Sequence, residues 1–166
     1  VYPRARLGFE AMRDTMLSIS GELDLKVGGP PEEMFGVGNS LRRSVYGKID
    51  RQYLPSVLNV FDFANPEMHA PRRYRTNVPQ QALFLMNSKF TIDRAKALSR
   101  RVHENHSGSN IEDKINTFYK YAYGRNSNSE EMRQSMNFLQ NSLNHEKKNE
   151  DLAKTWTYGY GKFDEN

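Results

Sequence analysis

Apolar residues recur at intervals of three and four positions through most of this 166-residue chain, and this spacing limits the fold more than any other feature. One face of an amphipathic α-helix carries such residues, whereas a half-buried strand alternates apolar and polar side chains. The clearest case is residues 111–123, where Ile111, Ile115 and Phe118 share a face and Gly124 follows. Further helices are predicted over residues 5–20, 55–61, 79–87, 91–105 and 128–143. The sequence therefore predicts a mainly α fold of about five or six helices, and leaves open a small strand pair.

Several helix ends carry recognisable capping residues. Gly21 follows the first helix as a C-terminal glycine, and Thr91 is the predicted N-cap of residues 91–105. Asn128 followed by Glu131 is an asparagine version of the capping box. Because the loop between the last two predicted helices is short and contains glycine, these helices are expected to form an αα-hairpin.

Three segments lack a helical period. Residues 26–40 contain two consecutive glycines and two consecutive prolines, which predict an irregular loop. Residues 43–50 show a weak alternation of side chains between two faces, which predicts a short strand. Residues 62–78 are irregular over a length that often carries function or is held by side-chain contacts. Pro79 then suits the first position of a helix whose apolar residues run almost all round, which predicts a buried helix.

The charge of the chain is spread evenly. There are 24 Lys and Arg against 20 Asp and Glu, and residues 1–75 and 76–166 each carry a net charge of +2. This pattern disfavours a nucleic-acid-binding function despite the basic pI of about 9.3. Arg6 and Glu10 are expected to pair across one helical turn. There is no cysteine, which excludes disulfides and thiol chemistry, and no apolar run reaches the length of a membrane span.

No residues are identified as catalytic. The acidic residues show no spacing that selects an acid–base pair, there is no Gly-x-Ser-x-Gly motif, and no metal site is predicted. Ionisable residues do lie between apolar ones in the first helix and in the irregular segment. Arg13, Asp14, Asp62 and Arg73 are therefore expected to form one buried or half-buried polar cluster.

A second set of polar and aromatic residues could contact a ligand. Arginines 72, 73 and 75 suit bidentate binding of a carboxylate or sulfate, and could equally tie the irregular segment to helix ends or to acidic residues. Flat aromatic side chains near the C-terminus could stack on sugar rings, or could pack against a following domain. The candidate ligand-contact residues are Asn65, Arg72, Arg75, Gln80, Gln81, Trp156, Tyr158 and Tyr160.

Five stretches in order resemble one family. They are Arg6-Leu7-x-x-Glu10-Ala11-x-Arg13-Asp14, then Arg42-Arg43-Ser44-x-Tyr46, then Phe61-Asp62-x-x-Asn65-Pro66, then Thr76-x-x-Pro79-Gln80-Gln81-Ala82-Leu83-x-x-x-Asn87, and finally Tyr123-Gly124-Arg125. Together they are similar to the planctomycete-type secreted domain of unknown function fifteen-fifty-three, from about residue 4 to about residue 155. A cysteine often found in that family before its Pro-Arg-Arg-like element is replaced here by Ala70.

The resemblance implies a context rather than a mechanism. Family members lie C-terminal to cytochrome-c-like modules in exported proteins, with a suspected link to polysaccharide breakdown and no established catalytic residues. It implies a periplasmic or cell-envelope location, no cofactor in this chain and haem c in an upstream domain. Residues 1–155 are expected to form a single helical domain, and residues 156–166 the start of a further domain missing from this fragment.

Two functions follow as expectations. The first is a non-catalytic interaction or scaffolding module whose partners are neighbouring domains of the same polypeptide and polysaccharide. The alternative is one part of an active site, glycan-processing or redox-linked, that neighbouring domains complete. Nucleic acid and a membrane span are not expected as partners.

Overall fold

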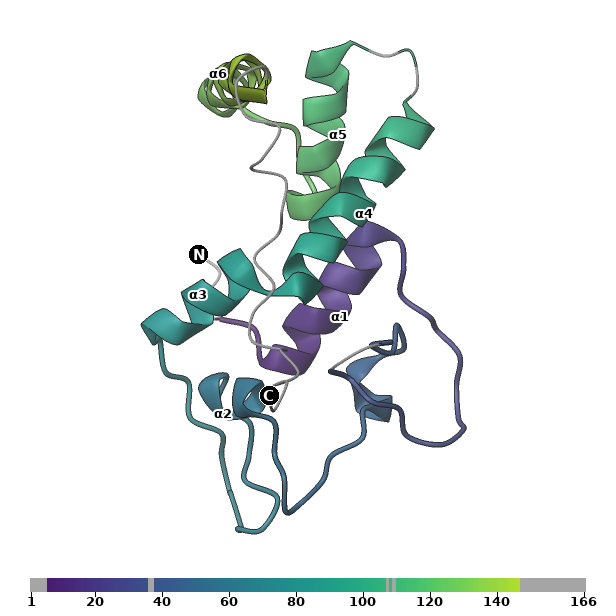
Figure 1. The fold of residues 1–166 in the computed structure, drawn as a ribbon, viewed down its shortest axis with the longest axis vertical. Helices are drawn as coiled ribbons and strands as arrows, with labels where there is room; N and C mark the ends of the chain where they lie inside the picture. The colour runs from purple at the N-terminus through teal and green to yellow at the C-terminus, as the bar shows by residue number, and fades with distance from the viewer. Residues whose placement is uncertain (1–5, 36–37, 107, 109, 147–166) are drawn as a thin grey trace, which may run out of the picture. The chain divides into compact units, whose positions relative to one another are not determined.

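The computed structural model describes residues 6–35, 38–106, 108 and 110–146, and it is mainly helical, as predicted (Figure 1). Its α-helices are α1 (Phe9–Ser20), α2 (Ser56–Val60), α3 (Pro79–Asn87), α4 (Lys89–Asn105), α5 (Ile111–Tyr123) and α6 (Ser129–Glu146), and one 3-10 helix, η1, covers Ser44–Tyr46. No helix in these described ranges has the length and apolarity to cross a membrane. The predicted aromatic tail, residues 156–166, lies outside the described residues.

The chain divides into two compact units, Val1–Ser107 and Gly108–Asn166. The first contains helices α1 to α4, with α1 and α4 packed side by side and α3 against α4 (Figure 1). The second contains α5 and α6.

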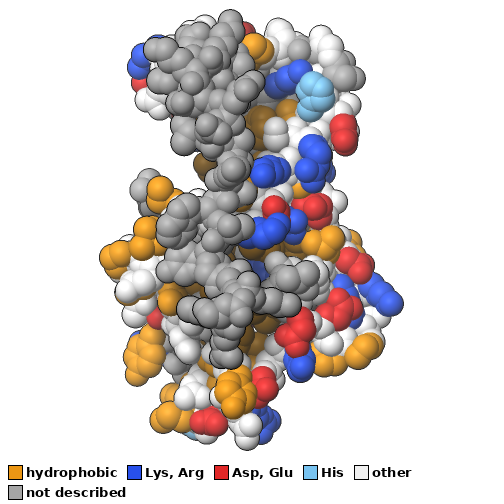
Figure 2. All heavy atoms as spheres, in the orientation of Figure 1, with side chains coloured by type: hydrophobic (Ala, Val, Ile, Leu, Met, Phe, Trp, Pro, Cys, Tyr) orange, Lys and Arg blue, Asp and Glu red, His pale blue; other side chains and the backbone are white. Residues whose placement is uncertain are grey.

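On the face of the protein drawn in Figure 2, basic and acidic side chains are interspersed, in keeping with the even charge of the sequence.

The two ends of helix α1 differ in how they are capped. It begins at Phe9 rather than at residue 5, and Gly8 is its N-cap without a side-chain hydrogen bond. At the other end Gly21 takes a left-handed conformation, φ 80°, which a glycine adopts without steric cost. The Arg101 guanidinium, from α4, donates to the Ile19 carbonyl at 2.7 Å and so satisfies a C-terminal carbonyl of α1.

The core of the first unit is a cluster of aromatic and aliphatic side chains. Phe9, Met34, Leu58 and Phe61 are buried in it, and Phe84 of α3 packs against them. The Phe9 and Phe61 ring centroids lie 5.3 Å apart, and those of Phe61 and Phe84 5.5 Å apart. These tilted and edge-on contacts are the favourable geometries for aromatic pairs. The core therefore joins the start of α1, the loop around residue 34, α2 and α3.

The strand predicted over residues 43–50 was wrong. Ser44–Tyr46 form η1, because Asp14 of α1 accepts hydrogen bonds from both the Ser44 amide and its hydroxyl at 2.7 Å and turns the chain there. Only an isolated bridge pairs Gly47 with Glu32. Local alternation could not reveal this, since the deciding contact comes from a residue 30 positions away.

The burial predicted for residues 79–87 was also wrong, although the helix has the predicted bounds. Phe84 and Leu85 are half-buried against the core, but Leu83 is 58% and Met86 73% exposed. A helix of nine residues that packs on one side leaves its other side open, whatever residues occupy it. Helix α4 likewise begins at Lys89, with the side chain of Ser88 rather than Thr91 as its cap.

The second unit contains the predicted αα-hairpin. Asn110 caps α5 through its side chain, and Gly124, φ 69°, ends it. The capping box at α6 is reciprocal. Asn128 Oδ1 accepts from the Glu131 amide, and Glu131 Oε2 accepts from the Asn128 amide, both at 2.8 Å. Glu131 is also bidentate with Arg125, at 2.7 Å to each nitrogen, which ties the connecting loop to the first turn of α6.

Candidate functional site

An open pocket of about 720 Å³ lies in the first unit, where the residues just before α1 meet the residues after α2 and the irregular chain before α3. Its volume falls within the range of about 300–1,000 Å³ common for small-molecule sites. The residues that line it are Arg6, Leu7, Gly8, Phe61, Asp62, Arg72, Arg73, Tyr74 and Arg75. The lining thus contains four arginines and one acidic residue.

Asp62 is the acidic residue of this lining and the most constrained one. Its backbone has φ 59°, the one left-handed non-glycine position among the described residues. Its Oδ2 accepts from the Thr76 amide at 2.8 Å and from Arg6 Nη2 at 2.5 Å, and its Oδ1 accepts from the Thr76 hydroxyl at 2.7 Å. Partial burial by itself would raise the pKa of the Asp62 carboxyl, but the hydrogen bonds from Thr76 and Arg6 outweigh it and the pKa lies below its usual value.

The remaining arginines of the pocket differ in their partners. Arg73 pairs with Glu10 of α1 at 2.6 Å, and its guanidinium lies 4.5 Å from the Phe63 ring centroid. Arg72 and Arg75 have no hydrogen-bond or ion-pair partner among the residues that the structure describes. These two arginines are exposed, so their donors are free to meet a ligand.

Two further features complete the lining. The first turn of α1 begins at the pocket, where Gly8 contributes no side-chain cap and Glu10 places an acidic side chain near the positive end of the helix dipole. Tyr74 is 81% exposed and presents a flat apolar ring between Arg73 and Arg75 in the chain. The pocket can therefore donate hydrogen bonds to an oxyanion and offer a ring surface for stacking.

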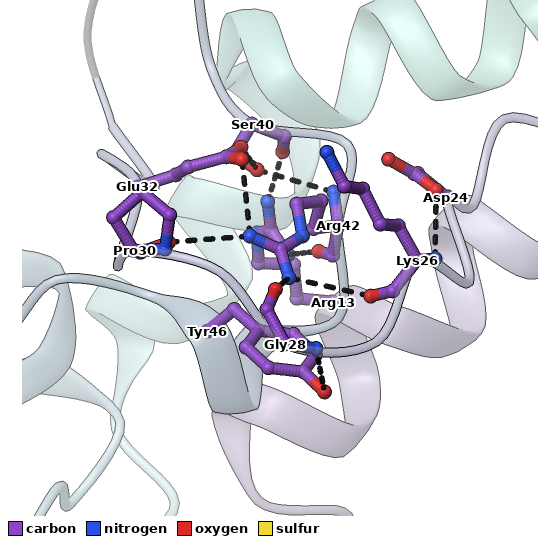
Figure 3. Close-up of polar contacts among 9 residues, drawn as sticks. All are labelled: Arg13, Asp24, Lys26, Gly28, Pro30, Glu32, Ser40, Arg42 and Tyr46. Carbon is purple, nitrogen blue, oxygen red and sulfur yellow. Dashed lines mark hydrogen bonds and ion pairs between the residues drawn. The ribbon is translucent and has the colours of Figure 1, made fainter.

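A second polar cluster in the same unit binds mainly to groups of the protein itself, although the Nε atoms of Arg13 and Arg42 are buried without a hydrogen-bond partner among the described residues (Figure 3). Arg42, only 4% exposed, donates to Glu32 Oε1 at 3.1 Å and to the carbonyls of Lys26, Gly28 and Pro30, and it lies 4.1 Å from the Tyr46 ring centroid. These contacts gather the glycine- and proline-rich loop around one guanidinium.

Arg13 belongs to the same cluster and is buried, with 1% exposure. It donates to the carbonyls of Arg42 and Ser40 and to the Ser44 hydroxyl, and its Nη1 lies 3.5 Å from Asp14. Burial lowers the pKa of Arg13, while Asp14 opposes that shift. Because these contacts are all within the protein, this cluster is a structural support of the loop rather than a ligand site.

The four residues expected in one polar cluster are thus divided between two places. Arg13 and Asp14 lie in the loop cluster, whereas Asp62 and Arg73 line the pocket. Glu10 lies close to both the loop cluster and the pocket. Its side chain pairs with Arg73 of the pocket, and Glu10 itself is three residues before Arg13 on α1.

The residues predicted to contact a ligand do not share one location in the structure. Arg72 and Arg75 line the pocket. Gln81 is buried and donates to the Val60 carbonyl at 2.8 Å, while Gln80 is exposed. Asn65 is exposed and forms a local turn in which its Oδ1 accepts from the Glu67 amide. Trp156, Tyr158 and Tyr160 lie outside the described residues.

Sequence reasoning missed the contribution of Arg6 and Tyr74 to the pocket lining, and it missed Thr76, which is not a lining residue but donates to Asp62. The expected Arg6–Glu10 helical pair does not form, because α1 begins at Phe9 and Arg6 precedes it. Arg6 turns instead to Asp62, and Glu10 to Arg73. The only sequence signal for Tyr74 was its place within the Arg-Arg-Tyr-Arg run.

Among the described residues, no group of three or more histidine and acidic side chains could hold a metal ion. The pocket lining offers hydrogen-bond donors, positive charge and an aromatic face.

Comparison with protein families finds a match over residues 1–139 to the PSD1 family, described as protein of unknown function (DUF1553). This confirms the resemblance seen in the sequence motifs. No curated protein and no solved structure matches the chain.

Proposed function

The chain belongs to the PSD1 family of proteins of unknown function, and we propose that it is an interaction module of an exported multidomain protein that binds an acidic polysaccharide at the arginine pocket. The observation that carries this proposal is that Arg72 and Arg75, which line a pocket of small-molecule size, have no ion-pair partner among the described residues, whereas the other two arginines of the lining pair with Asp62 and Glu10. Guanidinium groups bind carboxylates and sulfates with two parallel hydrogen bonds, which makes the ligand an oxyanion.

A polymer of sugars explains the rest of the lining better than a free anion does. Tyr74 is exposed beside the arginines, and aromatic rings stack readily on the apolar faces of flat ligands. The pocket is open to solvent and formed by irregular chain, so a polysaccharide can pass across it while one acidic unit occupies it. Asp62 is already committed to Arg6 and Thr76, which leaves Arg72 and Arg75 as the free donors.

The test is a binding titration of the full chain with dextran sulfate, polygalacturonate and neutral dextran. We expect both acidic polymers to bind and neutral dextran to bind at least tenfold more weakly, because the free arginines have no partner on a neutral chain. The double variant Arg72→Gln/Arg75→Gln should lose most of this affinity.

The matched control is Arg51→Gln/Arg100→Gln, which removes the same charge from exposed positions outside the pocket. Equal losses in the two double variants would mean that net charge, and not the pocket, attracts the polymer. Binding of none of the three polymers would refute the proposal.

A second function is supported by the strained backbone of Asp62. Left-handed conformations of non-glycine residues cluster at active sites, and this one lies in the pocket. In this alternative the pocket is one part of an active site, glycan-processing or redox-linked, that neighbouring domains complete. Polysaccharide cleavage by the parent protein that disappears on Arg75→Gln, with binding retained, would favour it over a purely binding role.

The wider context is proposed with it: export to the periplasm or cell envelope, haem c held by an upstream domain, residues 1–155 as one domain and a further domain after residue 155. A parent gene with a signal peptide and a Cys-x-x-Cys-His motif upstream of this region is the expected finding. A parent lacking both would remove this context while leaving the polysaccharide proposal to its own test.

A further inference from the structure

Asp62 poses a question that the proposed function leaves open. A carboxylate inside an anion-binding pocket should weaken binding, since it repels the ligand. Yet its side chain accepts three hydrogen bonds from within the protein, and it occupies a conformation that most residues avoid. Its contacts show what it does there.

The partners of Asp62 come from two segments of the chain that are distant in sequence. Thr76, which follows the arginine segment directly, donates to it through its amide and its hydroxyl. Arg6, which lies just before α1, donates to the same carboxylate. The left-handed backbone of Asp62 comes immediately after Phe61, whose ring is buried in the core, so the carboxylate is anchored on a rigid base.

Glu10 provides a natural comparison within the same structure. It is also a carboxylate paired with a pocket arginine, Arg73, but its only hydrogen bond to the irregular segment is to that side chain. Both members of this pair are partly exposed, with 44% of the Arg73 side chain and 29% of the Glu10 side chain accessible. Such a pair holds no backbone in place and occupies an arginine that a ligand could use.

We infer that Asp62 is a positioning residue for the anion site: it fixes the end of the arginine segment through Thr76, and so strengthens the binding of an anion that its own charge repels. Glu10 acts in the opposite sense, by competing with the ligand for Arg73. The inference rests on the proposed function for its ligand, but the fixing of the segment by Asp62 can be measured without any ligand.

The binding test uses dextran sulfate as the probe and compares two substitutions that each remove one negative charge. We expect them to change the affinity in opposite directions. Asp62→Asn keeps a residue tolerant of the left-handed conformation, but one amide oxygen cannot serve three donors. We expect it to bind about three- to tenfold more weakly, as the loss of an ordinary hydrogen bond gives. Glu10→Gln should bind about two- to fivefold more tightly. If repulsion alone governs the site, both variants bind more tightly, and the inference is wrong.

Thr76→Val removes the hydroxyl donor without any change in charge, and Thr76 is exposed, so the variant should fold normally. It is expected to weaken binding in the same direction as Asp62→Asn. The matched control is Thr15→Val on the exposed side of α1, whose hydroxyl bonds only within its own helix, and it should bind as the unaltered chain does. An unchanged affinity for Thr76→Val would overturn the inference.

A ligand-free measurement separates this inference from the proposed function. Limited trypsin digestion should cut after Arg73 and Arg75 faster in Asp62→Asn and Thr76→Val, relative to the cut after exposed Arg51, and no faster in Glu10→Gln. Unchanged cutting in the first two variants would show that Asp62 does not hold the segment. If the unaltered chain bound no polymer but these two variants were cut faster, the proposed function would fall and the positioning role would stand.

Discussion

The buried guanidinium of Arg13 donates a hydrogen bond of 2.9 Å to the backbone carbonyl of Arg42, so that one buried arginine holds the backbone of another. Arg42 in turn gathers the loop of residues 26–32 around its own side chain. Helix α1 thereby organises a loop that has no regular secondary structure of its own.

Substitution Arg13→Met should therefore destabilise the first unit strongly. It leaves the carbonyls of Ser40 and Arg42 buried without a donor, which costs about 2–4 kcal/mol of the free energy of unfolding. Chemical denaturation measures the change. Arg133→Met, which breaks an exposed pair with Glu130, is the control and should cost less than about 1 kcal/mol. Similar small effects of both variants would contradict a supporting role for Arg13.

Arg42→Lys should loosen the loop although it preserves the charge. Lysine lacks the planar fork of donors with which the Arg42 guanidinium reaches several carbonyls at once. The contact of this side chain with the Tyr46 ring is also altered. We expect faster amide hydrogen exchange at Gly28, whose amide donates to the Tyr46 hydroxyl, and a loss of about 1–3 kcal/mol in stability. Arg43→Lys, at the exposed neighbouring position, should change neither quantity.

Gly47→Ala should destabilise the core by overpacking. A Cβ at this position would overlap Met34 Sδ and lie 2.5 Å from its Cγ, and Met34 is buried. Forced repacking of this kind costs about 1–3 kcal/mol. The double variant with Met34→Ala should cost less than the two single changes added together, because the clash is then absent. Strict additivity in thermal or chemical unfolding would show that this contact is not the cause.

The capping box of α6 should fail in acid. The bidentate bond from Arg125, followed by the Asn128 amide, lowers the pKa of Glu131 from 4.5 to about 2. A carboxyl whose pKa is lower in the folded state stabilises it above the unfolded value, and that contribution is lost as pH falls from about 4.5 towards 2. NMR titration of the Glu131 carboxyl measures the pKa directly. Glu131→Gln should remove this part of the acid sensitivity, and an ordinary pKa near 4.5 would contradict the prediction.

Local patterns were sufficient for the helices. The bounds of α3 and α5 agree with the prediction, and the reciprocal bonds of Asn128 and Glu131 are those of the predicted box. These features depend on residues within one or two turns of each other, so propensity, periodicity and capping chemistry decide them. The predicted strand over 43–50 failed because a distant residue, Asp14, controls that backbone.

The sequence by itself determined the helical class, most helix ends and the family of this protein. Tertiary structure alone decided which charges of distant segments meet. Arg6 pairs with Asp62 across 56 positions, and Arg73 with Glu10 across 63. An ion pair between irregular segments has no period and no fixed spacing, so only the packing of the core around Phe9 and Phe61 brings those side chains together. That packing leaves Arg72 and Arg75 beside the pocket without partners among the described residues, and it is there that a ligand is proposed to bind.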